Sequence, residues 1–134
     1  MPKILVVDDN ADNRYLLLHM LQLNGYSVLS AVNGRDALDV AQKSSPDLVL
    51  MDMSMPVMDG WTATSLLKQE PRLSHIPVIA VTGHITYDDL RRASEVGCSD
   101  HLEKPIDYDV LIHTVAAHLT GGGRQTRPIY SGDR

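Results

Sequence analysis

The sequence predicts an α/β protein built on a doubly wound parallel sheet of five strands. Two observations support this prediction. Short continuous runs of Val, Ile, Leu and Met, at 4–7, 48–51 and 78–81, suit strands that are buried on both faces of a parallel sheet. These runs alternate with segments in which apolar residues recur every three or four positions, which is the spacing of amphipathic helices.

Five strand–helix pairs are expected in chain order. The strands are predicted at 4–7, 27–32, 48–52, 78–82 and 101–103. The first helix ends at Asn24-Gly25, a typical helix stop, and the later helices are predicted at about 36–43, 61–68, 87–96 and 107–119. Between the third strand and its helix, residues 53–60 are expected to form a loop because of Pro56 and the Asp59-Gly60 pair.

The apolar faces of the first and last helices are read from the spacing of their side chains. In the first helix we expect the inward residues to be Leu16, Leu17, Met20, Leu21 and Leu23. In the last helix we expect them to be Val110, Leu111, Val115 and Leu119.

The second and fifth strands are the most polar, so we expect them at the edges of the sheet. This favours the strand order 2-1-3-4-5, which is the order of flavodoxin-like folds. The doubly wound domain is expected to span residues 1–120. Residues 121–134 begin with three glycines and contain Arg124, Arg127 and Arg134, so they are expected to form a flexible basic tail.

Composition excludes several classes of function. A chain of 134 residues with 43% hydrophobic residues fits one globular domain. The net charge of -5 argues against general affinity for nucleic acid or for a membrane surface. The single cysteine excludes an internal disulfide, and no signal peptide or long apolar run is present, so we expect a cytoplasmic protein.

Each buried run stops at a residue that can handle a phosphate. The first ends at Asp8-Asp9, the third strand at Asp52, the fourth at Thr82, and the fifth leads into Lys104. Ligands of open parallel sheets bind outside the carboxyl ends of the strands, so these side chains should converge at one edge. Carboxylates, a hydroxyl and an ammonium together suit a divalent cation and a phosphoryl group.

These residues resemble the receiver domains of two-component response regulators. The resemblance covers about residues 1–120 and rests on four motifs at successive strand ends: Val7-Asp8-Asp9-Asn10, Met51-Asp52 with the loop to Gly60, Thr82-Gly83 and Lys104-Pro105. Taken singly, each residue has a plain alternative: Asp8 and Asp9 could cap a helix, Thr82 could lie in a turn, and Lys104 could be solvated.

The resemblance implies a role for each acidic residue. Asp52 is the expected phosphoacceptor. Asp9 and Asp52 are expected to bind Mg²⁺ (or Mn²⁺) directly, together with the backbone carbonyl of Ser54, and Asp8 through a water molecule. Lys104 is expected to pair with Asp52 or with the phosphoryl oxygens.

The resemblance also implies switch and tuning residues. Thr82 is expected to bond the phosphoryl group, and His101 to rotate in response, at a position where Tyr or Phe is more usual. Ser54 and His84 are expected to flank the path of the hydrolytic water and to tune dephosphorylation. The Lys104–Pro105 peptide bond is expected to be cis, which aims Lys104 at the pocket.

The expected function is that of a stand-alone receiver: a phosphoprotein of a two-component system, not an enzyme with a turnover substrate. Its phosphodonor would be a histidine kinase or a histidine phosphotransfer protein, docking on the first helix near Tyr15, Pro105 and Ile106. Phosphorylation would switch a protein-binding surface formed by the fourth helix, fifth strand and last helix, read by an unidentified downstream protein.

Three alternatives remain open from the residues. The chain could be a receiver fold that has lost phosphorylation, a phosphate sink or phosphorelay intermediate, or a receiver segment of a hybrid histidine kinase. Other phosphoryl-handling templates fit worse: there is no Gly-x4-Gly-Lys-Ser/Thr loop, and the acidic stretch after the first strand would repel a flavin phosphate.

Overall fold

The computed structural model describes residues 1–55, 57–83 and 86–120, and within them five parallel strands alternate with five helices. The elements are β1 (Lys3–Val7), α1 (Ala11–Leu23), β2 (Ser27–Ala31), α2 (Gly34–Ser44), β3 (Leu48–Asp52), α3 (Gly60–Gln69), β4 (Val78–Thr82), α4 (Tyr87–Val96), β5 (Asp100–Glu103) and α5 (Tyr108–Thr120). The strand order is β2-β1-β3-β4-β5. The predicted fold class and strand order are confirmed.

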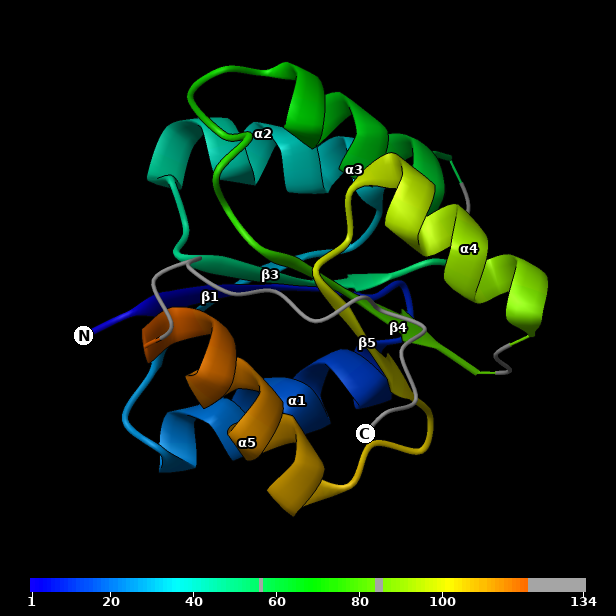
Figure 1. Cartoon of the computed structure of the whole chain (residues 1–134). Coiled ribbons are helices and arrows are strands. Elements are labelled where there is room, and N and C mark those ends of the chain that lie inside the picture. The colour runs from blue at the N-terminus through cyan, green and yellow to red at the C-terminus, as the bar shows by residue number, and fades with distance from the viewer. Residues whose placement is uncertain (56, 84–85, 121–134) are drawn as a thin grey trace.

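Two layers of helices cover the sheet. Helices α1 and α5 lie on one face, and α2, α3 and α4 lie on the other (Figure 1). Alternate residues of β1 enter different cores: Ile4 and Val6 pack with α1 and α5, whereas Leu5 and Val7 pack with α2 and α3. This alternation follows from the two-residue period of a strand, and it explains why the central strands are apolar throughout.

The predicted inward faces of α1 and α5 are wrong at three positions. Leu16 and Leu23 are 51% and 67% exposed, and Val110 is 51% exposed. In α1 the fully packed residues are Leu17 and Leu21, one helical turn apart. At 100° per residue, Leu16 and Leu23 lie about 120° and 140° around the helix from the mean direction of Leu17 and Leu21, so they point away from the sheet.

The loop between β3 and α3 is fixed at both ends by close backbone contacts. The Gly60 amide donates to the Met53 carbonyl at 3.3 Å, and the Gly34 amide at the start of α2 donates to the Met58 carbonyl at 3.0 Å. A Cβ at Gly60 would overlap the carbonyl oxygen of Asp52. Between these contacts Val57 has a φ of 69°, an uncommon conformation for a β-branched residue.

The close approach at Gly60 predicts that Gly60→Ala destabilises the protein by about 2–3 kcal/mol, because the obstructing atom is backbone and cannot move aside cheaply. Urea denaturation measures the loss. Gly83→Ala is the matched control, since a Cβ there meets nothing within 4 Å. Equal effects of the two substitutions would contradict the proposed contact.

Candidate functional site

Three carboxylates gather at the carboxyl edge of the sheet. Asp8 and Asp9 follow β1, Asp52 ends β3, and one oxygen from each lies within 4.8 Å of the others. Asp8 and Asp52 are 1% and 3% exposed, whereas Asp9 is exposed. The structure therefore brings together the three acidic residues that the sequence singled out.

Strand register and alternation account for this convergence. Val7 of β1 pairs with Met51 of β3, so the residues that follow them, Asp8 and Asp52, stand side by side. Both lie an even number of positions after core residues that face α1 and α5, so both side chains leave the same face of the sheet. Lys104 follows the core residue Leu102 by two positions, so its side chain leaves the same face of the sheet as the two carboxylates.

Lys104 contacts both buried carboxylates. Its Nζ lies 3.4 Å from Oδ2 of Asp8 and 3.4 Å from Oδ2 of Asp52. Its main-chain amide donates to the Thr82 carbonyl at 2.7 Å, which ties the segment after β5 to the end of β4, and the Lys104–Pro105 peptide bond is cis. From the sequence we named only Asp52 as a carboxylate partner of Lys104; Asp8 is a second partner at the same distance.

The electrostatics of the cluster are unfavourable for Asp52 without a cation. Burial, with a smaller contribution from the neighbouring Asp8 charge, raises the pKa of Asp52 from 3.8 to about 6 against two opposing effects. The Ser54 amide, which donates to Oδ1 of Asp52 at 3.1 Å, and the Lys104 ammonium both lower this pKa. Because burial is the largest cause, the ionised form of Asp52 is disfavoured at this position.

The residues present fit a magnesium ion. Oδ2 of Asp8 is buried and accepts no hydrogen bond from the described residues. Three carboxylates against the Lys104 ammonium leave a charge of about -2, which one dication would offset. Oxygen donors in this number suit Mg²⁺, which takes one or two carboxylates and keeps several waters.

The two residues expected to act in the switch, Thr82 and His101, lie on neighbouring strands. Thr82 ends β4, is 9% exposed, and its Oγ1 is buried without a hydrogen-bond partner in the described part of the chain. His101 lies on β5, pairs with Ala80 of β4, and is half-buried. Its Nδ1 also has no hydrogen-bond partner among those residues and lies 3.9 Å from Oδ1 of Asp100. Both side chains therefore have unused hydrogen-bonding capacity.

Of the two residues expected to tune dephosphorylation, the structure describes one. Ser54 is exposed beside the cluster, two residues after Asp52. His84 lies outside the described residues, as does the basic segment 121–134.

The capping alternative for the first acidic pair is not supported. The N-cap of α1 is Asn10, whose Oδ1 accepts from the Asn13 amide at 2.9 Å. Asp8 instead accepts the Asn10 amide through Oδ1 at 2.9 Å, which leaves Oδ2 turned toward Lys104. Asp8 and Asp9 are therefore available to the cluster.

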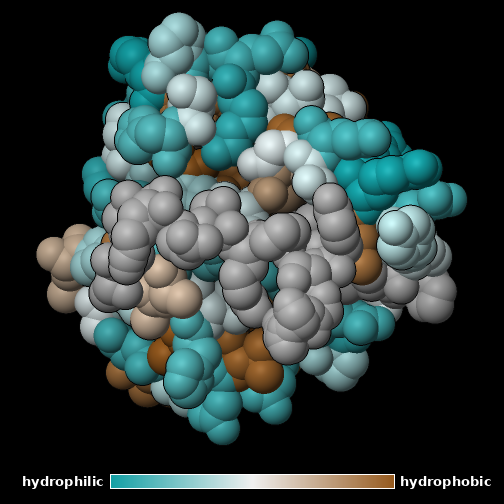
Figure 2. All heavy atoms as spheres, in the orientation of Figure 1, coloured by the Kyte–Doolittle hydropathy of each residue, from teal (hydrophilic) through white to brown (hydrophobic). Residues whose placement is uncertain are grey.

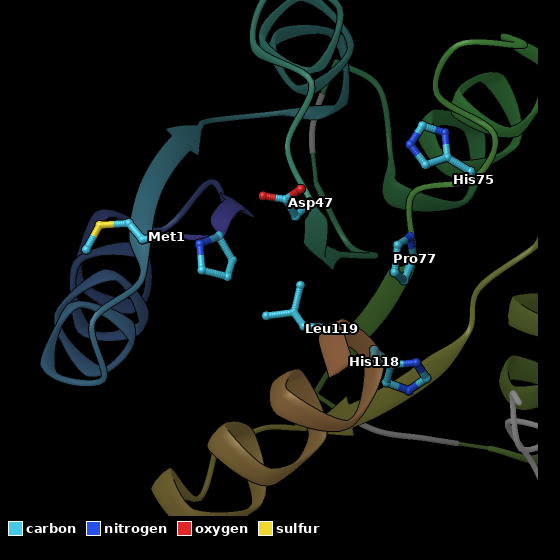
Figure 3. A pocket seen from close by; sticks show the side chains of 7 residues that line it. Met1, Asp47, His75, Pro77, His118 and Leu119 are labelled. Atoms are coloured by element: carbon cyan, nitrogen blue, oxygen red, sulfur yellow. The ribbon is translucent and has the colours of Figure 1, made fainter. Parts of the chain in front are cut away.

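The structure also has a hollow that lies away from the acidic cluster. It has a volume of about 830 Å³ and is lined by Met1, Pro2, Asp47, His75, Pro77, His118 and Leu119 (Figure 3). Met1, Asp47 and Pro77 precede β1, β3 and β4, so this hollow is at the amino edge of the sheet. Binding in open parallel sheets favours the carboxyl edge, where the buried carboxylates are.

Sequence comparison identifies the family. A family model described as the response regulator receiver domain matches residues 4–116. The chain belongs to the response regulator receiver family. It is 40% identical to the protein PilH of Pseudomonas aeruginosa over 121 residues, covering 90% of this chain and 100% of that one. It is 38% identical to the polar-differentiation response regulator DivK of Brucella anthropi over 120 residues, covering 89% and 98%.

Solved receiver structures agree with this assignment. The chemotaxis protein CheY4 of Vibrio cholerae superposes with a TM-score of 0.86 at 32% identity, covering 89% of this chain and 99% of that one. The receiver domain of the sensor histidine kinase PA1611 of Pseudomonas aeruginosa superposes with a TM-score of 0.81 at 30% identity, covering 90% and 98%. The latter is described with a magnesium ion coordinated in its active-site cleft. Within the described residues of our receiver, none of the helices is long and apolar enough to cross a bilayer.

One residue next to the cluster was missed from the sequence. Arg14 of α1 donates from Nη1 to the main-chain carbonyl of Asp8 at 2.8 Å. A signal was present, because a cation in the first turns of a helix is unfavourable in the field of the helix dipole and calls for a local partner.

The raised pKa of Asp52 predicts that Asp52→Asn stabilises the magnesium-free receiver at pH 8 by about 2 kcal/mol, since the amide avoids burying a charge. The folded-state pKa of about 6 exceeds the ordinary value of 3.8, so the folded wild type takes up a proton as the pH falls through 6. The advantage of the amide should therefore shrink between pH 8 and pH 5.

Urea denaturation in EDTA at both pH values measures this difference. Asp39→Asn on α2, an exposed carboxylate outside the cluster, should change stability by less than about 0.5 kcal/mol at either pH. An advantage of Asp52→Asn that grows toward pH 5 would have the wrong sign for this account.

Proposed function

We propose that this receiver accepts a phosphoryl group on Asp52 from a phosphohistidine, with Mg²⁺ (or Mn²⁺), and thereby switches a protein-binding surface. The observation that carries the proposal is the position of the Asp52 carboxylate: buried, beside two further carboxylates and 3.4 Å from the Lys104 ammonium. An aspartate that only stabilised the fold would gain nothing from burial beside two other carboxylates, since its ionised form is destabilised there.

Asp52 would act as the nucleophile. One carboxylate oxygen forms a bond to phosphorus, the bond from phosphorus to the donor imidazole nitrogen breaks, and the electron pair returns to that nitrogen. Repulsion between the carboxylate and the phosphoryl oxygens opposes this approach, so catalysis depends on positioning and on electrostatic stabilisation. Lys104 would turn from Asp52 to the phosphoryl oxygens as the new bond forms.

The metal ligands proposed are Asp9, Asp52 and the backbone carbonyl of Ser54, with Asp8 acting through a water molecule. When bound, the ion would offset the negative charge of the carboxylates and of the transferred group. Asp8 would also keep its contact with Lys104 and so maintain the distance between the ammonium and the acceptor. Ser54, at the exposed rim, would influence the hydrolytic water.

The readout would pass from Thr82 to His101. The unpartnered Oγ1 of Thr82 supports a role as a phosphoryl ligand, because a buried hydroxyl gains most from a new hydrogen bond. His101 lies on the adjoining strand, and its neighbour Asp100 accepts the His101 amide through Oδ1 at 2.8 Å and meets Nε2 of His118 through Oδ2 at 3.0 Å. A movement of His101 would therefore reach α5 and the surface formed by α4, β5 and α5.

The phosphodonor would dock on α1 beside the segment after β5. Tyr15 and Leu16 are 70% and 51% exposed, and a hollow of about 310 Å³ lies between Leu16, Pro105 and Ile106, next to Asp8 and Lys104. Figure 2 shows hydrophobic surface among hydrophilic side chains on the side of the molecule that carries α1 and α5. An apolar helix face on a donor would suit this surface.

The cellular role proposed is that of a cytoplasmic stand-alone receiver that signals through a downstream protein. A second candidate is a receiver that serves a histidine kinase as a phosphorelay intermediate or phosphate sink, or as a segment of a hybrid kinase. The similarity to the receiver domain of a sensor histidine kinase favours keeping this candidate. Identifying the protein that binds the beryllofluoride-treated form, and not the untreated form, distinguishes the two.

Incubation with acetyl phosphate and Mg²⁺ should add the mass of one phosphoryl group to the wild type, measured on the intact protein. Asp52→Asn should add none, since it lacks the nucleophile, and EDTA should abolish the addition to the wild type. Asp39→Asn serves as the control and should be modified like the wild type. A phosphoryl group that persists in Asp52→Asn would overturn the assignment of the acceptor.

Leu16→Ala should slow transfer from a phosphorylated histidine protein about tenfold, because it removes exposed apolar contact at the docking surface. Modification by acetyl phosphate should stay unchanged. Leu23→Ala, at a leucine that is also exposed but lies at the carboxyl end of α1, is the matched control. Equal transfer rates for the two variants would argue against docking at this place.

A further inference from the structure

Arg14 folds back from α1 toward the acidic cluster. Its Nη1 donates a 2.8 Å hydrogen bond to the carbonyl oxygen of Asp8, and its side chain is half-buried. This carbonyl belongs to the peptide that joins Asp8 to Asp9. The guanidinium therefore holds the peptide plane between the two acidic residues.

The helix dipole makes the position of Arg14, the fourth residue of α1, slightly unfavourable for a cation. The amino-terminal turns of a helix carry partial positive charge, so a cation there is unfavourable. Asn10 and Asp12 are the usual residue types for this end of the helix, and both occur. The Asp8 carbonyl, which accepts from Nη1 at 2.8 Å, is the partner that offsets this cost for Arg14.

Asp8 and Asp9 differ in how they are held. Asp8 donates its amide to the Ala31 carbonyl at 3.2 Å, accepts the Asn10 amide through Oδ1, and is buried. Asp9 lies beyond the end of β1 and is exposed, and no hydrogen bond between described residues fixes its carboxylate. The direction of the Asp9 side chain therefore depends on the peptide plane that precedes it.

We propose that Arg14 is a positioning residue: by holding the Asp8–Asp9 peptide it directs the Asp9 carboxylate into the cluster and so raises the affinity of the site for a divalent cation. This inference rests on the magnesium site of the proposed function. The planar fork of arginine fixes an acceptor more firmly than a flexible ammonium does.

Charge and positioning predict opposite effects of removing Arg14, and this makes the inference testable. On Coulombic grounds alone, the loss of a positive charge next to the carboxylates would tighten cation binding. Loss of positioning would weaken it, because metal affinity depends on outer residues that orient the ligands.

The experiment is calorimetric titration of the full chain with Mg²⁺. For Arg14→Met we expect the Kd to rise about tenfold, while the urea midpoint in EDTA stays close to that of the control. Arg14→Lys, which keeps the charge and one donor on a flexible stem, should raise the Kd less, by about threefold. The matched control is Arg35→Met, an exposed arginine in the first turn of α2, which should leave the Kd unchanged within about twofold.

The outcomes separate this inference from the proposed function. A wild type that binds no Mg²⁺ would overturn the proposed metal site itself. A wild type that binds, with an Arg14→Met variant of equal or lower Kd, would overturn the positioning role alone. Should Arg14→Met fail to fold, the Arg14→Lys variant decides: a raised Kd supports the role, and an unchanged or lower Kd overturns it.

Discussion

The rest of the site depends on one ion-pair arrangement, in which the buried carboxylates of Asp8 and Asp52 share the single ammonium group of Lys104. Strand pairing between β1 and β3 places Asp8 beside Asp52, and strand alternation turns both toward Lys104. The arrangement is electrostatically costly, which is expressed in the raised pKa of Asp52. A cluster of this kind favours the binding of a cation, which in the proposed function would also offset the negative charge of the incoming phosphoryl group.

The same geometry connects the cluster to the surface. The amide of Lys104 is bonded to the carbonyl of Thr82, so the ends of β4 and β5 are joined directly behind the carboxylates. Asp100, two positions before the core residue Leu102, links His101 to His118 of α5. In the proposed function, a change at Asp52 would therefore have a short covalent and hydrogen-bonded route to the surface of α4, β5 and α5 that needs no large movement of the sheet.

The fold and the members of the site were predictable because both follow from strands. Apolar runs that end in polar residues define a parallel sheet and its functional edge, and register then brings Asp8, Asp52 and Lys104 together. The helix faces were less predictable: Leu16 and Val110 have helical spacing, but periodicity does not say how wide a stripe the sheet covers. Arg14 was missed because a cation near the amino end of a helix signals a local partner but does not identify it, and that partner is a main-chain carbonyl.

The most direct test of the account is the anomalous scattering of a crystal of the wild-type receiver soaked with Mn²⁺. The account predicts one strong peak between the carboxylates of Asp9 and Asp52 and near the carbonyl of Ser54, with Lys104 still beside the acceptor. A peak at another place, with none at the carboxylates, would contradict it.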